Sequence, residues 1–163
     1  MQKTVICLSV LFVSFALTYC TPRNDFKAIN DFKDNAWPID STQSFTFEIT
    51  DVNKSYDFYY LVRNATVYPF YNLYIKRALT DSAGTAMSKS MDELILFDTK
   101  TGKPFGSGLG DIFDHKFKIK SLSNYRFKHA GEYTFSVEQN MRQDPLVGVM
   151  SVGVSVEPVS SEQ

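Results

Sequence analysis

The sequence predicts an all-β fold: a single β-sandwich, jelly-roll or immunoglobulin-like, preceded by a cleaved signal peptide and a short tether. The chain is rich in aromatic residues, with 14 Phe and 9 Tyr among 163 residues. Many of them alternate with polar residues, which is the period of a half-buried strand. Such runs recur with turn residues between them, and this spacing is typical of sandwiches and barrels.

The N-terminal segment predicts export. Lys3 precedes a short apolar run over residues 5–17, the pattern of a secretory signal peptide. The run is shorter than the stretch of about 20 apolar residues that a transmembrane helix needs. We therefore expect a cleaved signal peptide over residues 1–19 and no membrane-spanning helix in the rest of the chain.

Residues Leu17-Thr18-Tyr19-Cys20 resemble a bacterial lipobox. This resemblance implies cleavage before Cys20 and its acylation with chains such as palmitate, since several acyl chains anchor a protein more stably than one. Tyr19 stands where a small residue is usual, and the alternative is a secreted protein whose cysteine is incidental. The other cysteine, Cys7, lies in the leader. The mature chain is therefore expected to lack an internal disulfide and a cysteine zinc site.

The mature chain divides into a lipidated tether (20–33), a sandwich domain (34–157) and a disordered tail (158–163). Alternation and turn residues predict strands over residues 45–50, 56–63, 71–80, 90–97, 116–121, 133–138 and 147–156. Residues 90–97 also fit a short helix, although their neighbours favour a strand. Trp37 is predicted to be a packed anchor at the domain edge, with a ligand platform as the alternative.

A glycine-rich segment contains Gly106, Gly108 and Gly110. Their G-x-G-x-G spacing is not the G-x-G-x-x-G of a dinucleotide site, and no Lys-Ser/Thr pair of a phosphate loop follows. We expect a loop in which glycine reaches positive φ.

Asp111, Asp114 and His115 follow these glycines. Two carboxylates and one imidazole are too few to predict a metal site, and we expect Asp114 and His115 to hold the loop by hydrogen bonds. Asp92 and Glu93 would face opposite sides of a strand and form no catalytic pair. The chain shows no G-x-S-x-G motif. We therefore predict no enzyme and no cofactor.

Charge and loop composition bear on partners. There are 17 basic and 18 acidic residues and no long basic block, which predicts no nucleic-acid partner. The polar connection over residues 138–146 fits either a partner surface or a solvated loop.

Four blocks carry a family resemblance: residues 59–64 with 68–74, residues 106–114, residues 131–142, and Pro145-Leu146 followed by Gly148 and Val152-Gly153. In their order and spacing they resemble the gliding-motility lipoprotein family GldH of the Bacteroidota, over nearly the whole chain. The resemblance implies an outer-membrane lipoprotein of the cell envelope that acts in gliding motility and is linked to type IX secretion. Cys20, as the lipidation site, is the one functional residue that transfers.

Two main hypotheses follow. The first is a non-enzymatic assembly or interaction component, anchored to the membrane through Cys20 and bound to other envelope or secretion-system proteins. Its possible contact residues are Gly106, Gly108, Gly110, Asp111, Asp114, His115, Glu138, Gln139, Met141 and Arg142. The alternative is a surface carbohydrate-binding sandwich that stacks sugars on Trp37, Tyr68 or Tyr71. A hydrolase, a third hypothesis, would need two or more of Asp111, Asp114, His115 and His129 to converge in a pocket.

Overall fold

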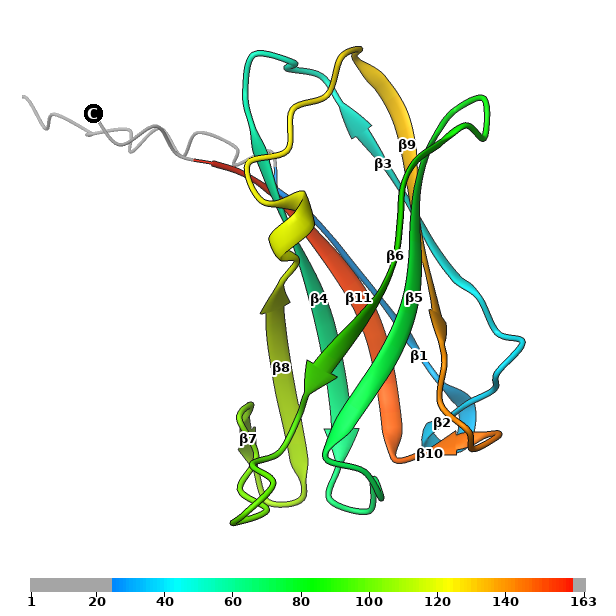
Figure 1. Cartoon of the computed structure of the whole chain (residues 1–163), viewed down its shortest axis with the longest axis vertical. Helices are drawn as coiled ribbons and strands as arrows, with labels where there is room; N and C mark the ends of the chain where they lie inside the picture. Colours follow the sequence, from blue (N-terminus) through cyan, green and yellow to red (C-terminus); the bar gives the residue numbers. More distant parts are fainter. Residues whose placement is uncertain (1–24, 160–163) are drawn as a thin grey trace, which may run out of the picture.

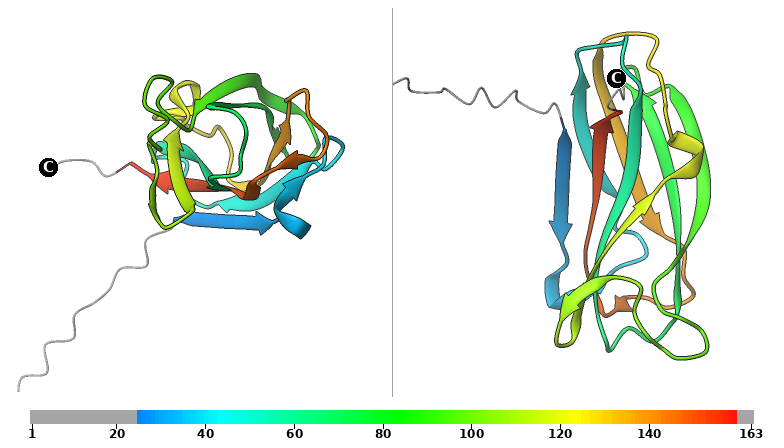
Figure 2. Two further views of the ribbon diagram at one scale, coloured as in Figure 1. Left: turned by 90° about the horizontal axis from the view of Figure 1, so that it is seen from below. Right: turned by 90° about the vertical axis from the view of Figure 1, so that its left-hand side faces the viewer.

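The computed structural model describes residues 25–159, which form a sandwich of two antiparallel sheets (Figures 1 and 2). The strands are β1 (Phe26–Asp31), β2 (Ala36–Trp37), β3 (Gln43–Ile49), β4 (Tyr56–Ala65), β5 (Asn72–Asp81), β6 (Ala86–Ile95), β7 (Ser107–Leu109), β8 (Ile112–Lys118), β9 (Gly131–Gln139), β10 (Leu146–Val147) and β11 (Val149–Pro158). Two short 3-10 helices are η1 (Lys33–Asn35) and η2 (Lys120–Leu122). The predicted all-β sandwich is confirmed.

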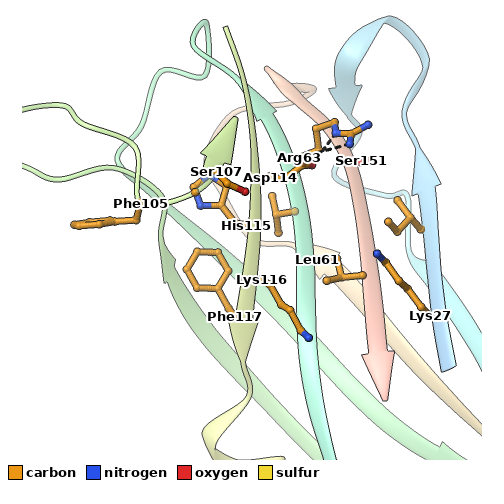
Figure 3. A pocket seen from close by; sticks show the side chains of 13 residues that line it. Lys27, Leu61, Arg63, Phe105, Ser107, Asp114, His115, Lys116, Phe117 and Ser151 are labelled. Atoms are coloured by element: carbon orange, nitrogen blue, oxygen red, sulfur yellow. Dashed lines mark hydrogen bonds and ion pairs between the residues drawn. The ribbon is translucent and has the colours of Figure 1, made fainter. Parts of the chain in front are cut away.

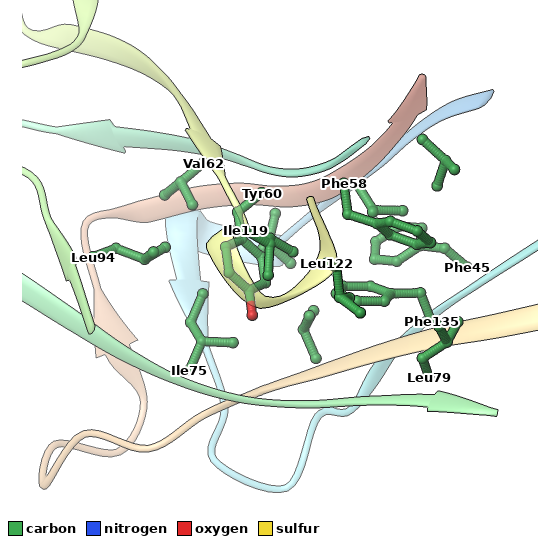
Figure 4. Packing of buried hydrophobic residues seen from close by; sticks show 14 of the residues in the cluster. Phe45, Phe58, Tyr60, Val62, Ile75, Leu79, Leu94, Ile119, Leu122 and Phe135 are labelled. Carbon is green, nitrogen blue, oxygen red and sulfur yellow. The ribbon is translucent and has the colours of Figure 1, made fainter. Parts of the chain in front are cut away.

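The larger sheet has the order β1-β11-β4-β8-β7, the smaller has β3-β9-β5-β6, and β2 pairs with β10. The core lies between the two main sheets (Figure 4). Alternation turns Phe45 of β3 and Phe135 of β9 inward, opposite Phe58 and Tyr60 of β4. The rings of Phe58 and Phe135 are 5.7 Å apart. Each such side chain contributes about 1.5–3 kcal/mol when it is fully buried.

The first strand corrects the predicted tether over residues 20–33. From Phe26 onward that prediction is wrong, because β1 pairs antiparallel with β11 through Asp31. The ring of Phe26 lies 5.5 Å from that of Phe47 in the facing sheet. The inward positions of β1 also include Ala28 and a polar residue, so the strand lacks the strong apolar alternation that would reveal it.

Trp37 closes one end of the sandwich. Its side chain is fully buried, its ring stacks on Phe32 at 4.9 Å, and its indole N–H donates to Ser41 O at 2.8 Å. It is therefore a packed anchor, as predicted, and is not available as a ligand platform.

The glycine-rich segment is a hairpin and not the expected loop. β7 pairs with β8, and β8 begins at Ile112, earlier than the predicted strand over residues 116–121. Gly110 and Asp111 make the two-residue turn, with Gly110 at φ 64°, the left-handed conformation that such turns favour. The positive φ expected of the glycines is thus adopted by Gly110 alone of the three.

The two ends of the sandwich carry different sets of connections. The proximal end, where Asp25 leads into β1, carries the connections over residues 50–55, 82–85 and 119–130. The distal end carries β2, β10 and the connections over residues 38–42, 66–71, 96–106, 110–111 and 140–145. In Figure 1 the proximal end is at the top and the distal end at the bottom.

Three sequence predictions concern the chain termini. The signal peptide over residues 1–19 and the lipidation site Cys20 lie outside the described residues, as do the last four residues. The tail prediction is wrong for residues 158 and 159, because Pro158 ends β11 and the N–H of Val159 donates to Ser55 O at 2.8 Å. Within residues 25–159, no helix is long and apolar enough to cross a membrane.

Candidate functional site

His115 holds the β7–β8 hairpin in place from inside. It lies on the inward face of β8, is buried, and its Nε2 is 2.9 Å from Asn64 Oδ1. A Cβ on Gly106 would lie 2.8 Å from its ring, so glycine is needed for this close approach. Burial lowers the pKa of His115, although Asp114 opposes this shift. His115 is therefore neutral at neutral pH and has a positioning role.

Asp114 faces the other side of β8 and makes the ion pair that ties the hairpin strand to β4. Arg63 donates from Nε to Asp114 Oδ1 at 2.7 Å and from Nη2 to Oδ2 at 3.0 Å. These hydrogen bonds lower the pKa of Asp114. Both side chains are about half exposed, so the pair contributes only about 0.2–1 kcal/mol.

A hollow of about 550 Å³ lies on the outer face of the larger sheet beside this pair (Figure 3). Ile29, Leu61 and Ser151 from three adjacent strands line it, together with Lys27 and Lys116. Lys116 binds Glu157 at 2.7 Å. It also lies over the Tyr59 ring at 4.2 Å. The Arg63 and Lys116 cations at this hollow are thus already engaged within the domain.

The second predicted contact segment begins at the end of β9. Gln139 is buried and shapes the segment, because its Oε1 accepts the N–H of Met141 at 2.7 Å and its Nε2 donates to Gln143 O at 3.2 Å. Glu138 accepts a hydrogen bond from Thr42 Oγ1 at 2.8 Å, and Arg142 is exposed. Gln139, like His115, can therefore act on a partner only by positioning its neighbours.

The fold brings both predicted segments to the distal end. The connection between β4 and β5 joins them: Thr66 N donates to Asp111 O at 2.9 Å. On its other side Ala65 N donates to Gly148 O at 2.8 Å. Gly148 follows β10, into which the segment after β9 leads, so the hairpin and that segment lie on either side of this connection although they come from different sheets.

Sequence reasoning missed the apolar character of this distal end. Leu109 at the hairpin tip is 93% exposed, Val67 64% and Phe105 62%. Ten large apolar side chains of the described residues are exposed, and eight lie in the distal connections or the adjoining strand ends. These eight are Ile39, Val67, Tyr71, Ile95, Phe105, Leu109, Ile112 and Val147. The other two lie along β1 and β6, and none lies in the proximal connections.

A second hollow, of about 460 Å³, opens at the same end between the connections over residues 66–71 and 97–102. We call it the distal hollow. Phe70, Tyr71 and Phe97 supply its aromatic lining. Asp98 fixes one wall, since its Oδ1 accepts the N–H of Thr101 at 2.7 Å and that of Lys100 at 3.0 Å. An aromatic hollow with ordered walls suits an apolar side chain.

A polar network inside the sandwich also escaped sequence reasoning. Arg77 points inward from β5 with only 1% of its side chain exposed, and its Nε donates to Asp92 Oδ2 at 2.9 Å. Tyr60 OH donates to the same oxygen at 2.7 Å, and Arg77 Nη2 donates to Ser121 Oγ at 2.7 Å. The network joins β4, β5, β6 and η2 and is a structural lock. In the sequence, this network is indicated by the position of Arg77, which falls in the same two-residue alternation as the apolar residues Ile75 and Leu79 and so points inward with them.

Of the four residues suspected of catalysis, Asp114 and His115 line a common hollow, the one on the outer face of the larger sheet. Asp111 lies in the distal hairpin turn, whereas His129 lies in the proximal connection before β9. Within residues 25–159, no group of three or more His, Cys, Asp or Glu side chains could hold a metal ion. Asp114 is paired with Arg63, and the His115 ring with Asn64, so both side chains are engaged in holding the β7–β8 hairpin and give no support to a hydrolase.

Two of the three suspected sugar platforms are unavailable for stacking. Trp37 is fully buried and Tyr68 is 5% exposed, with its hydroxyl donating to Asn72 O at 2.7 Å. Of the three, only Tyr71 is exposed. The carbohydrate-binding hypothesis therefore loses two of the three platforms on which it depended.

Comparison with known proteins identifies relatives of this chain. The family model for the GldH lipoprotein matches residues 24–156. A gliding motility lipoprotein GldH homolog of Christiangramia forsetii is 29% identical over 130 residues, which cover 74% of this chain and 76% of the relative. The gliding motility lipoprotein GldH of Flavobacterium johnsoniae is 26% identical over 130 residues, covering 76% of this chain and 78% of the relative.

Similarities to solved structures are weak. The VP2 subviral particle of infectious bursal disease virus matches with a TM-score of 0.34 and 13% identity, over 81% of this chain and 30% of VP2. The latent PorU of Porphyromonas gingivalis matches with a TM-score of 0.31 and 9% identity, over 82% of this chain and 13% of PorU. Neither similarity is close enough to inform function.

Proposed function

Because the chain belongs to the GldH lipoprotein family, we propose that it is a non-enzymatic outer-membrane lipoprotein that acts in gliding motility and the associated type IX secretion machinery. Its role there is that of an assembly or interaction component. The two curated relatives carry the name of gliding motility lipoproteins, and this supports the motility part of the proposal.

One structural observation carries the interaction role. The chain enters the domain at the proximal end, while the hairpin and the segment after β9 lie at the distal end. Five residue steps separate Cys20 from Asp25, which span at most about 18 Å when fully extended. A lipid on Cys20 would hold the proximal end near the membrane, and the predicted contact segments would face away from it.

The anchor is tested by replacing Cys20→Ala in the native host. We expect the wild-type protein to lose residues 1–19 and gain the mass of acyl chains, whereas the variant remains unacylated and leaves the membrane fraction. Intact-mass measurement and fractionation read this out. A wild-type protein that is soluble and unacylated would contradict the proposed anchor.

The role itself is tested by complementing a deletion strain. Wild type should restore cell gliding and adhesin secretion, and Cys20→Ala should restore neither although the domain is folded and abundant. Asp111→Ala and Arg142→Ala, two exposed distal substitutions, should reduce both. A deletion strain that glides and secretes normally would contradict the proposed role.

A further inference from the structure

We propose that the distal end docks onto an apolar surface of a second envelope protein. Leu109 and Phe105 would be the protruding anchors, and the distal hollow would receive an apolar or aromatic side chain of that partner. The proposal rests on the envelope location given above, but it does not depend on gliding.

The first support is the amount of exposed apolar side chain. A monomeric soluble domain rarely gathers large apolar side chains in one region, and such patches mark interaction sites. Here eight of ten exposed large apolar side chains gather at one end. Leu109, at 93% exposure, packs against almost nothing in its own domain, so its side chain has no evident role in the stability of the fold.

The second support is the rigidity of the anchors. Leu109 ends β7 just before the two-residue turn, and it pairs with Ile112 across the hairpin. The turn is held to the neighbouring connection by the hydrogen bond from Thr66 N to Asp111 O. The backbone N–H of Phe105 donates to Leu96 O at 2.9 Å, and this hydrogen bond fixes the position of Phe105. Anchors that are ordered before binding lose less conformational entropy when they bind.

The third support is the distal hollow, which opens at the same end of the sandwich as these anchors. Its volume of about 460 Å³ and its lining by Phe70, Tyr71 and Phe97 fit a large apolar side chain. Protein interfaces concentrate their binding energy where such an anchor fills a pocket. The distal end therefore offers both protrusions and a cavity, as a complementary protein surface would require.

Charge and geometry favour a protein over a lipid surface. The distal connections over residues 38–42, 66–71, 96–106, 110–111 and 140–145 contain four acidic and three basic residues, so they have no surplus of positive charge for anionic lipids. An apolar centre with a balanced polar rim is typical of a protein interface. The short span from Cys20 to Asp25 also keeps the opposite end at the membrane.

The test compares cysteine reactivity at the two ends in native membranes. The full chain has only Cys7 and Cys20, so Leu109→Cys and Ser82→Cys each add one reporter, the second in the exposed turn between β5 and β6. In membranes, a maleimide should label Leu109→Cys at least about tenfold more slowly than Ser82→Cys, a factor equivalent to about 1.4 kcal/mol. After detergent extraction and purification, both should react equally fast.

Equal labelling of the two positions in native membranes would overturn the proposal. A photo-crosslinking residue at position 109 identifies the occupant, and we expect a discrete adduct with one other protein, weakened by Phe105→Asp and unchanged by Ser82→Asp. An adduct with lipid, or with a second copy of this chain only, would also overturn it. If the adduct forms but Phe105→Asp cells still glide and secrete, docking stands and the proposed role fails.

Discussion

The proximal and distal ends of the sandwich are built from the same strands yet differ in chemistry. Of the three proximal connections, those over residues 50–55 and 119–130 carry Lys54, Lys120, Arg126 and Lys128 against a single acid, Asp51. Lys54 pairs with that acid at 3.6 Å. The distal connections have balanced charge and hold most of the exposed large apolar side chains. The ends of the strands fix where the connections lie, while the sequences of the connections decide what each end of the sandwich can bind.

This difference suggests a simple orientation. Basic, polar connections suit the anionic surface of a membrane, and an apolar end suits a protein partner. The position of Asp25 at the proximal end, five residue steps after Cys20, is consistent with that orientation.

The largest effect is expected where a distal apolar residue supports the fold. Trp37→Ala should destabilise the domain by about 3–5 kcal/mol, because it empties a fully buried site against Phe32. Tyr71→Ala, at the same end but 47% exposed, should cost far less. Urea unfolding of both variants measures the difference. Similar losses would mean that Tyr71 also belongs to the core.

The proximal basic residues should govern attraction to membranes. Replacing Lys120, Arg126 and Lys128 by Gln should weaken binding of the unlipidated Cys20→Ala domain to anionic vesicles by about 1 kcal/mol per residue. Lys100→Gln with Lys103→Gln, at the distal end, is the matched control and should change binding little. Vesicle sedimentation at low salt measures both. Equal losses from the two sets would remove the electrostatic difference between the ends.

Asp57 should make the proximal end sensitive to acid. Burial alone would raise its pKa, but hydrogen bonds from Lys118, the N–H of Asn124 and Ser123 lower it. A lowered folded-state pKa contributes stability above the unfolded value of about 3.9, and this stability is lost as the pH falls through the folded value.

Asp57→Asn should therefore be less stable than wild type by about 1–3 kcal/mol at neutral pH, because the charge-assisted hydrogen bonds are lost. The difference should shrink below a pH of about 4. Unfolding curves across this range measure it. At the distal end, the N–H of Thr101 lowers the pKa of Asp98, and Asp98→Asn provides the matched comparison. A pH-independent difference for Asp57→Asn would contradict the assigned pKa direction.

The smallest effect on stability is expected at the hairpin tip. Leu109→Asp should change the free energy of unfolding by no more than about 0.5 kcal/mol, as usual for surface positions, because the side chain is 93% exposed. Its effect should appear only in partner binding. Thermal unfolding of the purified variant checks this. A strongly destabilised variant would show that Leu109 packs within its own domain.

Much of the fold could be predicted from alternation. Clear period-two patterns occur over residues 45–50, 56–63 and 133–138. They correspond to β3, β4 and β9 of the structure. β1 could not be found in this way, because Lys27 and Asp31 flank its outward Ile29 and one inward position is Asn30. It is a strand because β11 offers it a paired edge, and that partner lies more than 100 residues away in the sequence.

The candidate site was less predictable for the same physical reason. The sequence indicated the hairpin residues and the segment after β9, but only the topology brings them to one end through the hydrogen bonds of Thr66 and Ala65. The exposure of Leu109 follows from its place at a sheet edge. The buried network of Arg77 was likewise not predictable, because its partners Asp92, Tyr60 and Ser121 come from separate parts of the chain.

Hydrogen–deuterium exchange of the protein tests the difference between the two ends most directly, when native membranes are compared with detergent-purified protein. The account predicts that the distal connections over residues 66–71 and 96–106 exchange more slowly in membranes than after purification. The proximal turn over residues 82–85 should exchange alike in both. Distal connections that exchange equally fast in membranes and in detergent would contradict the claim that this end is occupied.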